Sequence, residues 1–155
     1  MKGNEKVIET LNDLLSDELT AINQYIVHAE MAEDWGYPVL HESAEKRAID
    51  EMKHAEKHIA RILFLEGRPI VSNYKKIYIG EDVPKIYEND RISEQEAIDK
   101  YNAAIKLCVE VGDNGTKEML DAILQEEEDH IDYIESELEK IAQMGLAMYL
   151  TTLTK

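Results

Sequence analysis

Two histidines each follow a glutamate by three residues: His54 follows Glu51, and His130 follows Glu127. Side chains three residues apart share one face of a helix, so each pair can present a carboxylate and an imidazole to one metal ion. The spacing alone decides little, because a chain this acidic with five histidines contains about one such pair by chance. A lone buried histidine is also more often a core residue than a ligand. The surroundings of the two pairs therefore matter more than their spacing.

Glutamates stand on the apolar stripes of all four predicted long helices. Glu18 lies seven residues after Leu11 and seven before Tyr25, in line with core side chains. Glu94 lies in the same way seven residues before Tyr101. The glutamates of the two Glu-x-x-His pairs interrupt the stripes of their own helices. Each long helix therefore points at least one carboxylate inward, near its middle.

Four carboxylates buried face to face would destabilise the fold, unless they were protonated or matched by cations. Two divalent metal ions would supply that match, with two carboxylates as bridges and one imidazole and one further carboxylate for each ion. Oxygen and nitrogen donors without a thiolate suit iron or manganese and fit structural zinc poorly. We therefore predict a dinuclear metal site. Its ligands are Glu18, Glu51, His54, Glu94, Glu127 and His130.

Helical periodicity runs through four long segments that must position these residues. They are predicted as helices over residues 5–34, 39–65, 83–111 and 116–144. Glycine and proline at Gly36-Tyr37-Pro38 and Gly67-Arg68-Pro69 end the first two segments, and glycines at 112 and 115 end the third. Thr116 is the expected N-cap of the fourth helix, and Gly145 ends it. The short turn between the first two helices predicts an antiparallel pair.

Residues 70–82 lack a helical period and are predicted as an extended crossover. A connection of that length can run along a bundle, so the third helix is expected to start at the same end as the second. An apolar tail over 146–153 predicts a short fifth helix. The fold class is thus all-α: a four-helix bundle with a long crossover between helices two and three, formed by residues 1–155 as one domain.

The composition excludes several classes of protein. With 33 acidic and 17 basic residues, the formal net charge of −16 disfavours binding to nucleic acid and anionic lipid. No apolar run is long enough for a membrane span, and no secretory signal is evident. The one cysteine, Cys108, cannot form an intrachain disulfide or a CxxC pair and is expected in the core. These features predict a cytoplasmic protein with no membrane or nucleic-acid partner.

Motifs from residue 1 to 150 resemble those of the bacterioferritins, which have a ferritin-like fold. Together these motifs are highly specific. They are the opening Met-Lys-Gly, Ala21-Ile22-Asn23-Gln24-Tyr25, Asp50-Glu51-Met52-Lys53-His54-Ala55, Arg61-Ile62-Leu63-Phe64-Leu65-Glu66-Gly67, Ile79-Gly80-Glu81-Asp82-Val83 and Glu127-Glu128-Asp129-His130-Ile131-Asp132.

The resemblance implies a hollow shell of 24 subunits that stores iron. It implies that Fe(II) is oxidised by O2 or H2O2 at an intrasubunit di-iron centre, and that Fe(III) mineral is kept inside. A ferredoxin-type protein is the expected reductant for iron release. Tyr25 would be a hydrogen-bond donor to the site or a redox-active side chain. The implied ligands are Glu18 and His54 for one iron, Glu94 and His130 for the other, and Glu51 and Glu127 as bridges.

Met52 is expected to face away from the bundle interior. It lies one residue past Glu51, about 100° around the helix, on a second apolar stripe with Ile49, Ile59 and Leu63. An outward apolar stripe implies a partner surface, and a flexible interface residue is the common use of methionine there. The resemblance implies instead that Met52 ligates haem b, which two subunits share across a twofold axis.

Some positions depart from the bacterioferritin pattern. Lys46 and Arg47 stand where the family often has histidine and an acidic residue. The resemblance implies that both side chains face the cavity of the shell. Neither can bind iron while protonated, which argues against an inner-surface iron site. His58 replaces the more usual phenol, one turn beyond the ligand histidine of the same helix, and has no assigned role. His28 and His41 are expected on exposed faces.

Acidic side chains match positions that line one type of pore in the resembling family. Asp34 and Glu66 are expected at neighbouring ends of one helical hairpin, whereas Asp132 and Glu139 share a face seven residues apart. Such a pore would concentrate Fe(II) by electrostatic attraction. An ordinary solvated acidic face is the alternative.

Other functions fit the same bundle. One is a non-storage di-iron oxidase or peroxidase resembling rubrerythrin, although the missing CxxC pair argues against the full rubrerythrin plan. Another is a haem-carrying electron-transfer protein whose buried carboxylates hold an inert metal. A DNA-protecting mini-ferritin fits least, because there is no basic tail.

Overall fold

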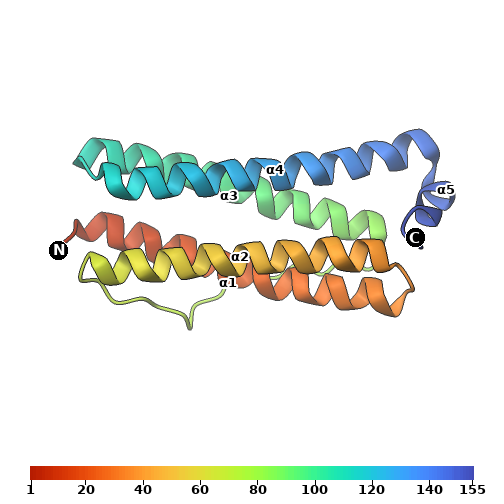
Figure 1. Cartoon of the computed structure of the whole chain (residues 1–155), viewed down its shortest axis with the longest axis horizontal. Helices are drawn as coiled ribbons and strands as arrows, with labels where there is room; N and C mark the ends of the chain where they lie inside the picture. Colours follow the sequence, from red (N-terminus) through yellow and green to blue (C-terminus); the bar gives the residue numbers. More distant parts are fainter.

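The computed structural model describes all residues, 1–155, and contains five helices and no strand. α1 and α2 form one antiparallel pair, α3 and α4 form a second pair beside it, and α5 turns across one end (Figure 1). The predicted all-α four-helix bundle with a short fifth helix is confirmed. None of the helices is both long and apolar enough to cross a membrane. The helices are α1 Glu5–Asp34, α2 Pro38–Phe64, α3 Val83–Val111, α4 Asn114–Met144 and α5 Leu146–Thr151.

The crossover between α2 and α3 returns the chain along the bundle, as predicted. α2 and α3 begin at the same end in Figure 1, so they run parallel. A helix of 27 residues is about 40 Å long, and only an extended segment can cover that length in so few residues. The crossover passes beside α1 and so connects the two helical pairs.

The helix ends lie within two residues of the predicted positions. One predicted N-cap is wrong, at the start of α4. α4 begins before Thr116, and its cap is Asp113, whose side chain accepts from the Thr116 backbone N–H at 3.0 Å. The Thr116 hydroxyl also donates to Asp113 and accepts from Arg61 Nε at 2.9 Å. Gly112 ends α3 at φ 76°, a backbone conformation that glycine adopts without strain. Thr116 therefore links α4 to α2 and does not cap its own helix.

Polar side chains spaced four residues apart on α1 hold the crossover in place. Each bonds a backbone group of the crossover, which replaces the hydrogen bonds that an extended chain outside a sheet would lack. The α1 side chains and their partners are Asn12 with Ile70 and Arg68, Ser16 with Asn73, Thr20 with Lys75, Gln24 with Tyr78, and His28 with Gly80, at 2.7–3.1 Å.

His28 and Arg47 lie inside the bundle, so the predictions that placed them on exposed or cavity-facing surfaces were wrong. His28 is fully buried and its Nδ1 lies 2.9 Å from Asp90, while Arg47 is 4% exposed and donates to the same carboxylate at 3.0 Å. Asp90 on α3 supplies the partner that makes burial of both groups possible. His41 is partly exposed, with Nδ1 2.8 Å from the Ala29 carbonyl.

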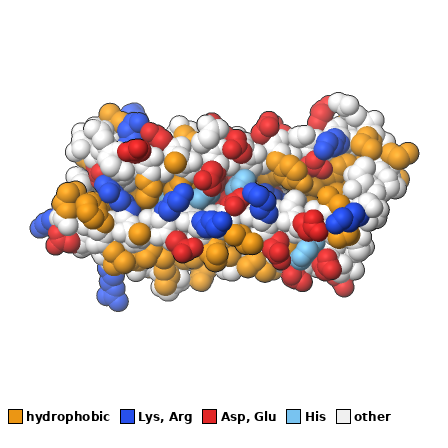
Figure 2. All heavy atoms as spheres, in the orientation of Figure 1, with side chains coloured by type: hydrophobic (Ala, Val, Ile, Leu, Met, Phe, Trp, Pro, Cys, Tyr) orange, Lys and Arg blue, Asp and Glu red, His pale blue; other side chains and the backbone are white.

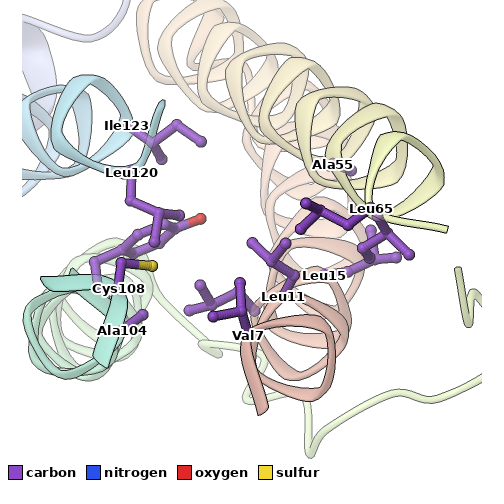
Figure 3. Packing of buried hydrophobic residues seen from close by; sticks show 12 residues of the cluster. Val7, Leu11, Leu15, Ala55, Leu65, Ala104, Cys108, Leu120 and Ile123 are labelled. Atoms are coloured by element: carbon purple, nitrogen blue, oxygen red, sulfur yellow. The ribbon is translucent and has the colours of Figure 1, made fainter. Parts of the chain in front are cut away.

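The largest buried cluster lies between the two helical pairs, at the end where α1 begins. Figure 3 shows Val7, Leu11 and Leu15 of α1 facing side chains of the other three long helices. Cys108 is 1% exposed within this cluster, which confirms its predicted place in the core. Ile26 of α1 is 48% exposed and lies outside this cluster.

Replacing Gly80 by alanine is expected to lower the free energy of unfolding by roughly 1–3 kcal/mol. A Cβ at this position would lie 2.3 Å from the Ile86 backbone nitrogen and 2.6 Å from the Lys85 carbonyl carbon, and backbone cannot rotate away. Thermal melting of Gly80→Ala beside Ser72→Ala, an exposed change in the same crossover, measures the effect. An unchanged melting temperature for Gly80→Ala would contradict the close approach.

Candidate metal centre

Six side chains from the four long helices meet midway along the bundle, and none is more than 8% exposed. They form two groups of four, within which one ligand atom from each residue lies within 4.8 Å of the others. Glu51 and Glu127 belong to both groups, which is the relation expected of bridging ligands. The groups are Glu18, Glu51, His54 and Glu127, and Glu51, Glu94, Glu127 and His130.

Each of the six side chains has one buried atom without a hydrogen-bond partner. Close contacts exist, such as 3.0 Å between His54 Nδ1 and Glu127 Oε1, but they lack hydrogen-bond geometry. A buried polar atom left unpaired costs about 1–3 kcal/mol, and more when it is charged. Metal ions would satisfy all of them, so this donor set fits a dinuclear site. The atoms are Glu18 Oε2, Glu51 Oε1, His54 Nδ1, Glu94 Oε2, Glu127 Oε1 and His130 Nδ1.

Two further carboxylates orient the imidazoles through their other ring nitrogens. His54 Nε2 lies 2.6 Å from Glu126, and His130 Nε2 lies 3.1 Å from Asp50. Such contacts hold each ring with its Nδ1 toward the site and raise the basicity of that nitrogen. Asp50 in turn pairs with Lys46 at 3.1 Å, so Lys46 neutralises an orienting carboxylate. The contact of Glu126 was not foreseen, because it joins residues 72 positions apart with no shared periodicity.

The four carboxylates form two groups by the direction of their pKa shifts: the pKa is raised for Glu51 and Glu127 and lowered for Glu18 and Glu94. Burial raises the pKa of Glu51 well above its usual value, and the nearby Glu18 adds to the shift. Burial also raises the pKa of Glu127, with repulsion from Glu51 and Glu94. For Glu18, burial is outweighed by contacts with Glu51 and His54, which bring its pKa to about 2. The pKa of Glu94 is likewise lowered against burial. All four can be ionised together only when cations offset their charge.

Both imidazoles lie among carboxylates that favour their charged form. Burial alone would lower the pKa of His54, but contacts with Glu127, Glu18 and Glu51 raise it above its ordinary value. The pKa of His130 is raised against burial mainly by Glu94. The negative field that stabilises a proton on these rings equally favours a metal cation, which competes with protons for the same nitrogens.

Two buried phenols donate to the site in a reciprocal arrangement. Tyr25 of α1 donates to Glu94 of α3 at 2.5 Å, and Tyr101 of α3 donates to Glu18 of α1. Burial, assisted by the neighbouring carboxylates, raises the pKa of both phenols well above the usual range, so each keeps its proton. Tyr25 was predicted near the site, whereas Tyr101 was used only to define the stripe around Glu94. The signal was present, because each tyrosine follows the site glutamate of its own helix by seven residues and so lies on the same face, although it donates to the glutamate of the other helix.

The site approaches the surface on two sides. Histidine atoms are visible on the face shown in Figure 2. His130 is 8% exposed and lines a shallow pocket together with residues of α2 and α4. On the opposite side, a narrow cavity of about 70 Å³ runs between α1, α3 and the crossover and reaches Glu18 and Glu94. Lys75 and Lys100 both pair with Asp17 along this cavity, at 2.9 and 2.8 Å.

Met52 is separate from the six-residue site and lies on the outer surface of α2. It is 46% exposed, with Ile49 at 42% and Leu63 at 58%, while Ile59 is only partly exposed. Figure 2 shows hydrophobic side chains gathered along one edge of the visible face, over α1 and α2. The predicted outward apolar stripe is therefore present.

The four acidic residues predicted to line a pore are exposed, but they do not gather in one chain. Asp34 ends α1, whereas Glu66 follows the end of α2, and antiparallel pairing puts these ends at opposite ends of the bundle (Figure 1). The length of α2, about 40 Å, separates them. The expectation of neighbouring ends was wrong, and a pore that uses both residues must combine several subunits.

Sequence comparisons agree with this architecture. The family model described as "Ferritin-like domain" matches residues 8–144. Bacterioferritin of Brucella melitensis is 40% identical over 96% of this chain and 92% of its own length. Bacterioferritin of Rhodobacter capsulatus is 41% identical over 94% of this chain and 90% of its own length, and that of Streptomyces coelicolor is 39% identical over 98% and 91%.

A four-helix bundle with a buried cluster of carboxylates and imidazoles defines this chain as a ferritin-like protein. The identities, which extend over nearly the whole chain, narrow the class further. The chain belongs to the bacterioferritin family, and this membership supports an iron-storage function of the ferritin type.

Proposed function

We propose that this protein is a ferroxidase that oxidises Fe(II) to Fe(III) at the site formed by the six convergent side chains and stores the ferric mineral. One observation carries the proposal: six buried side chains each present one unpartnered ligand atom to a common centre. A structural core would not leave six such atoms unsatisfied. The likeness to bacterioferritins supports iron as the metal.

In this proposal the protein's own residues hold and discriminate the metal ions. Glu18 with His54 would bind one ion and Glu94 with His130 the other, while Glu51 and Glu127 would bridge them. Bound iron would supply the electrons that reduce O2 or H2O2. Glu126 and Asp50 keep the imidazoles oriented, and the buried surroundings exclude water from the reacting centre.

Titration with Co(II) tests the site without turnover. Two equivalents per chain are expected to bind, and the melting temperature should rise by several degrees, since a ligand at 100 times its Kd stabilises the folded state by about 2.7 kcal/mol. The exposed group of Glu30, His41 and Glu45 is a second potential cation site, so the titration is made in a His41→Ala background. Binding of fewer than two equivalents there would reject the dinuclear site.

The exposed apolar stripe supports the further proposal that chains pair and share haem b. α1 and α2 expose six large apolar side chains, and an apolar patch on the outer face of a helical pair is typical of a surface that a partner covers. A Met52 thioether from each of two chains would ligate the haem iron, which would serve as an electron carrier. Dimers of this kind are proposed to build a 24-subunit shell, with a ferredoxin-type reductant for iron release. The exposed residues are Ile26, Val27, Ile49, Met52, Leu63 and Phe64.

Mass under native conditions separates this proposal from its alternatives. A particle of 24 chains supports storage in a shell. A dimer would favour a non-storage di-iron oxidase or peroxidase, or a haem electron-transfer protein. Rapid oxidation of added Fe(II) would favour the ferroxidase over a protein whose buried carboxylates hold an inert metal.

Neutralising three acidic side chains together, as Asp34→Asn, Glu66→Gln and Asp132→Asn, is expected to slow iron uptake several-fold at low salt. The physical reason is that acidic pores raise the local concentration of Fe(II), an effect that salt screens over about 8 Å at physiological ionic strength. Stopped-flow uptake at low and high salt measures the change.

The matched control carries the same loss of three charges elsewhere, as Glu9→Gln, Glu56→Gln and Glu135→Gln, all at exposed positions. Equal rates for the two triple variants would show that overall charge, and not a pore, controls uptake. An uptake rate equal to that of the parent protein at every salt concentration would reject this route for iron.

A further inference from the structure

The shallow pocket beside His130 is about 300 Å³ in volume and lies between α2 and α4. Two of its lining residues are Lys46 and Arg47, at which the sequence departs from the bacterioferritin pattern. Arg47 is 4% exposed, whereas Lys46 is exposed. The pocket therefore combines a buried and an exposed positive charge in a chain whose net charge is −16. The other lining residues are Ser43, Asp129, His130 and Tyr133.

The guanidinium of Arg47 has donors that the chain leaves without acceptors. Its Nη2 donates to Asp90 at 3.0 Å. Burial alone would lower the pKa of Arg47, but the Asp90 carboxylate raises it, so the guanidinium stays charged. Its Nε and Nη1 are buried and have no hydrogen-bond partner. The contact with the Tyr25 ring, 4.6 Å from Cζ to the ring centroid, does not provide an oxygen acceptor for these nitrogens.

The balance of charge in the lining favours an anion over a metal cation. Lys46 pairs with Asp50 at 3.1 Å and Arg47 pairs with Asp90, but neither of these two carboxylates lines the pocket. Asp129 is the one carboxylate that does, and it is exposed. The lysine and arginine thus outnumber the acidic residues of the lining by two to one. Buried donors of a charged group need acceptors, and an anion supplies them.

A tetrahedral oxyanion matches the donors around the pocket. The planar fork of an arginine and the ammonium of a lysine are both groups that bind phosphate oxygens. The hydroxyls of Ser43 and Tyr133 can each donate to a further oxygen. The present bond of the Ser43 hydroxyl, to the Leu40 carbonyl of its own helix, is long at 3.3 Å.

We propose that this pocket is an oxyanion-binding site and that inorganic phosphate is its ligand, held between Lys46 and Arg47. The site is chemically distinct from the metal centre, which presents four carboxylates and attracts cations. Only His130 belongs to both. Binding of phosphate requires no metal ion, so the proposal stands or falls independently of the ferroxidase function.

Equilibrium dialysis of metal-free protein against inorganic phosphate, with a chelator present, measures the number of sites and the Kd. One phosphate per chain is expected. Lys46→Met should raise the Kd at least about threefold, because it removes the exposed cation of the pocket. The matched control is Lys106→Met, which removes an exposed lysine of α3 outside the pocket and should change the Kd by less than about twofold. Sulfate should compete with phosphate, whereas chloride at equal ionic strength should not.

Asp129→Asn tests the sign of the effect. Removal of the one carboxylate in the lining should lower the Kd for phosphate about threefold, whereas a cation site would lose affinity. Glu128→Gln removes an exposed carboxylate of α4 outside the pocket and should change the Kd by less than about twofold. Both substitutions are at exposed positions, so the variants are expected to fold, and circular dichroism checks this.

Three results would overturn the proposal. The first is the absence of bound phosphate in the protein without substitutions at about 10 mM phosphate, since water alone would then serve Arg47. The second is an equal rise of the Kd in Lys46→Met and Lys106→Met, which would show an effect of overall charge. The third is weaker binding in Asp129→Asn. The Co(II) titration tests the metal centre separately, so the failure of one proposal is distinguishable from the failure of the other.

Discussion

Removal of a single ligand, by Glu94→Ala or His130→Ala, is expected to reduce the initial rate of Fe(II) oxidation by at least about 100-fold. Substitution of residues that only orient ligands commonly costs 10–100-fold, and loss of a ligand itself should cost more. Both residues belong to the same group of four potential donors, so the two variants should fail alike. Stopped-flow absorbance of the Fe(III) product at two Fe(II) per chain measures the rate.

Two comparisons make this prediction specific. Glu128→Ala removes an exposed carboxylate next to the bridging position on α4 and should retain the parental rate. Asp50→Asn keeps all six ligands but weakens the orientation of His130, so its rate should fall by an intermediate factor of about 10. Parental kinetics in Glu94→Ala and His130→Ala together would contradict the dinuclear assignment.

Stability should change in the opposite direction from activity at the bridging positions. Glu127→Gln keeps the shape of the side chain but removes a carboxyl group whose ionisation is opposed by burial and by repulsion from Glu51 and Glu94. Thermal melting in the presence of a chelator should therefore be unchanged or higher in this variant, while the stabilisation by Co(II) should be lost. If Glu127 served packing alone, Glu127→Gln would lower the melting temperature in chelator and would leave any stabilisation by Co(II) unchanged.

The fold could be predicted because it depends on local patterns. Helical periodicity defines four segments, and glycine and proline at Gly36, Pro38, Gly67 and Gly112 end three of them. The end of α3 at Gly112 and the parallel start of α2 and α3 both follow from such local information. The N-cap of α4 was predicted at Thr116 but is Asp113, whose side chain accepts from the Thr116 backbone N–H. Aspartate and threonine are both common N-caps, so residue type alone does not separate them.

The convergence of the six side chains could be predicted for a different reason. A charged residue on an apolar stripe is a conflict between local pattern and global fold, and such conflicts mark sites. Here four buried glutamates lie near the middle of four helices that pack together. Few arrangements other than a shared metal site avoid repulsion among their carboxylates. Periodicity places a residue on a face but does not identify its partner.

Contacts between helices explain what the sequence alone could not predict. His28 was expected on an exposed face, but it belongs to the polar face of α1 that binds the backbone of the crossover. Arg47 was expected toward a cavity because the matching positions of the resembling family face one, but it is buried and donates to Asp90, 43 residues away. Glu126 became visible only once α2 and α4 were packed. In each case the missing information was a partner distant in sequence.

Met52→Leu is expected to remove bound haem while the protein remains folded and assembled. Leucine preserves the bulk and apolar character of the exposed stripe but lacks the thioether that would bind iron. At 46% exposure Met52 is too accessible to contribute much to the stability of a single chain, so the substitution tests a ligand and not a core residue. Purified protein should lose the Soret absorbance almost completely.

The control for this experiment is Ile49→Leu, which changes the shape of a neighbouring exposed side chain on the same stripe without touching the thioether. That variant should keep its haem and its low-spin spectrum. If haem were held only by apolar contact between two chains, both variants would retain it to a similar degree. A full Soret band with an unchanged low-spin spectrum in Met52→Leu would therefore show that the stripe binds haem without Met52 as a ligand.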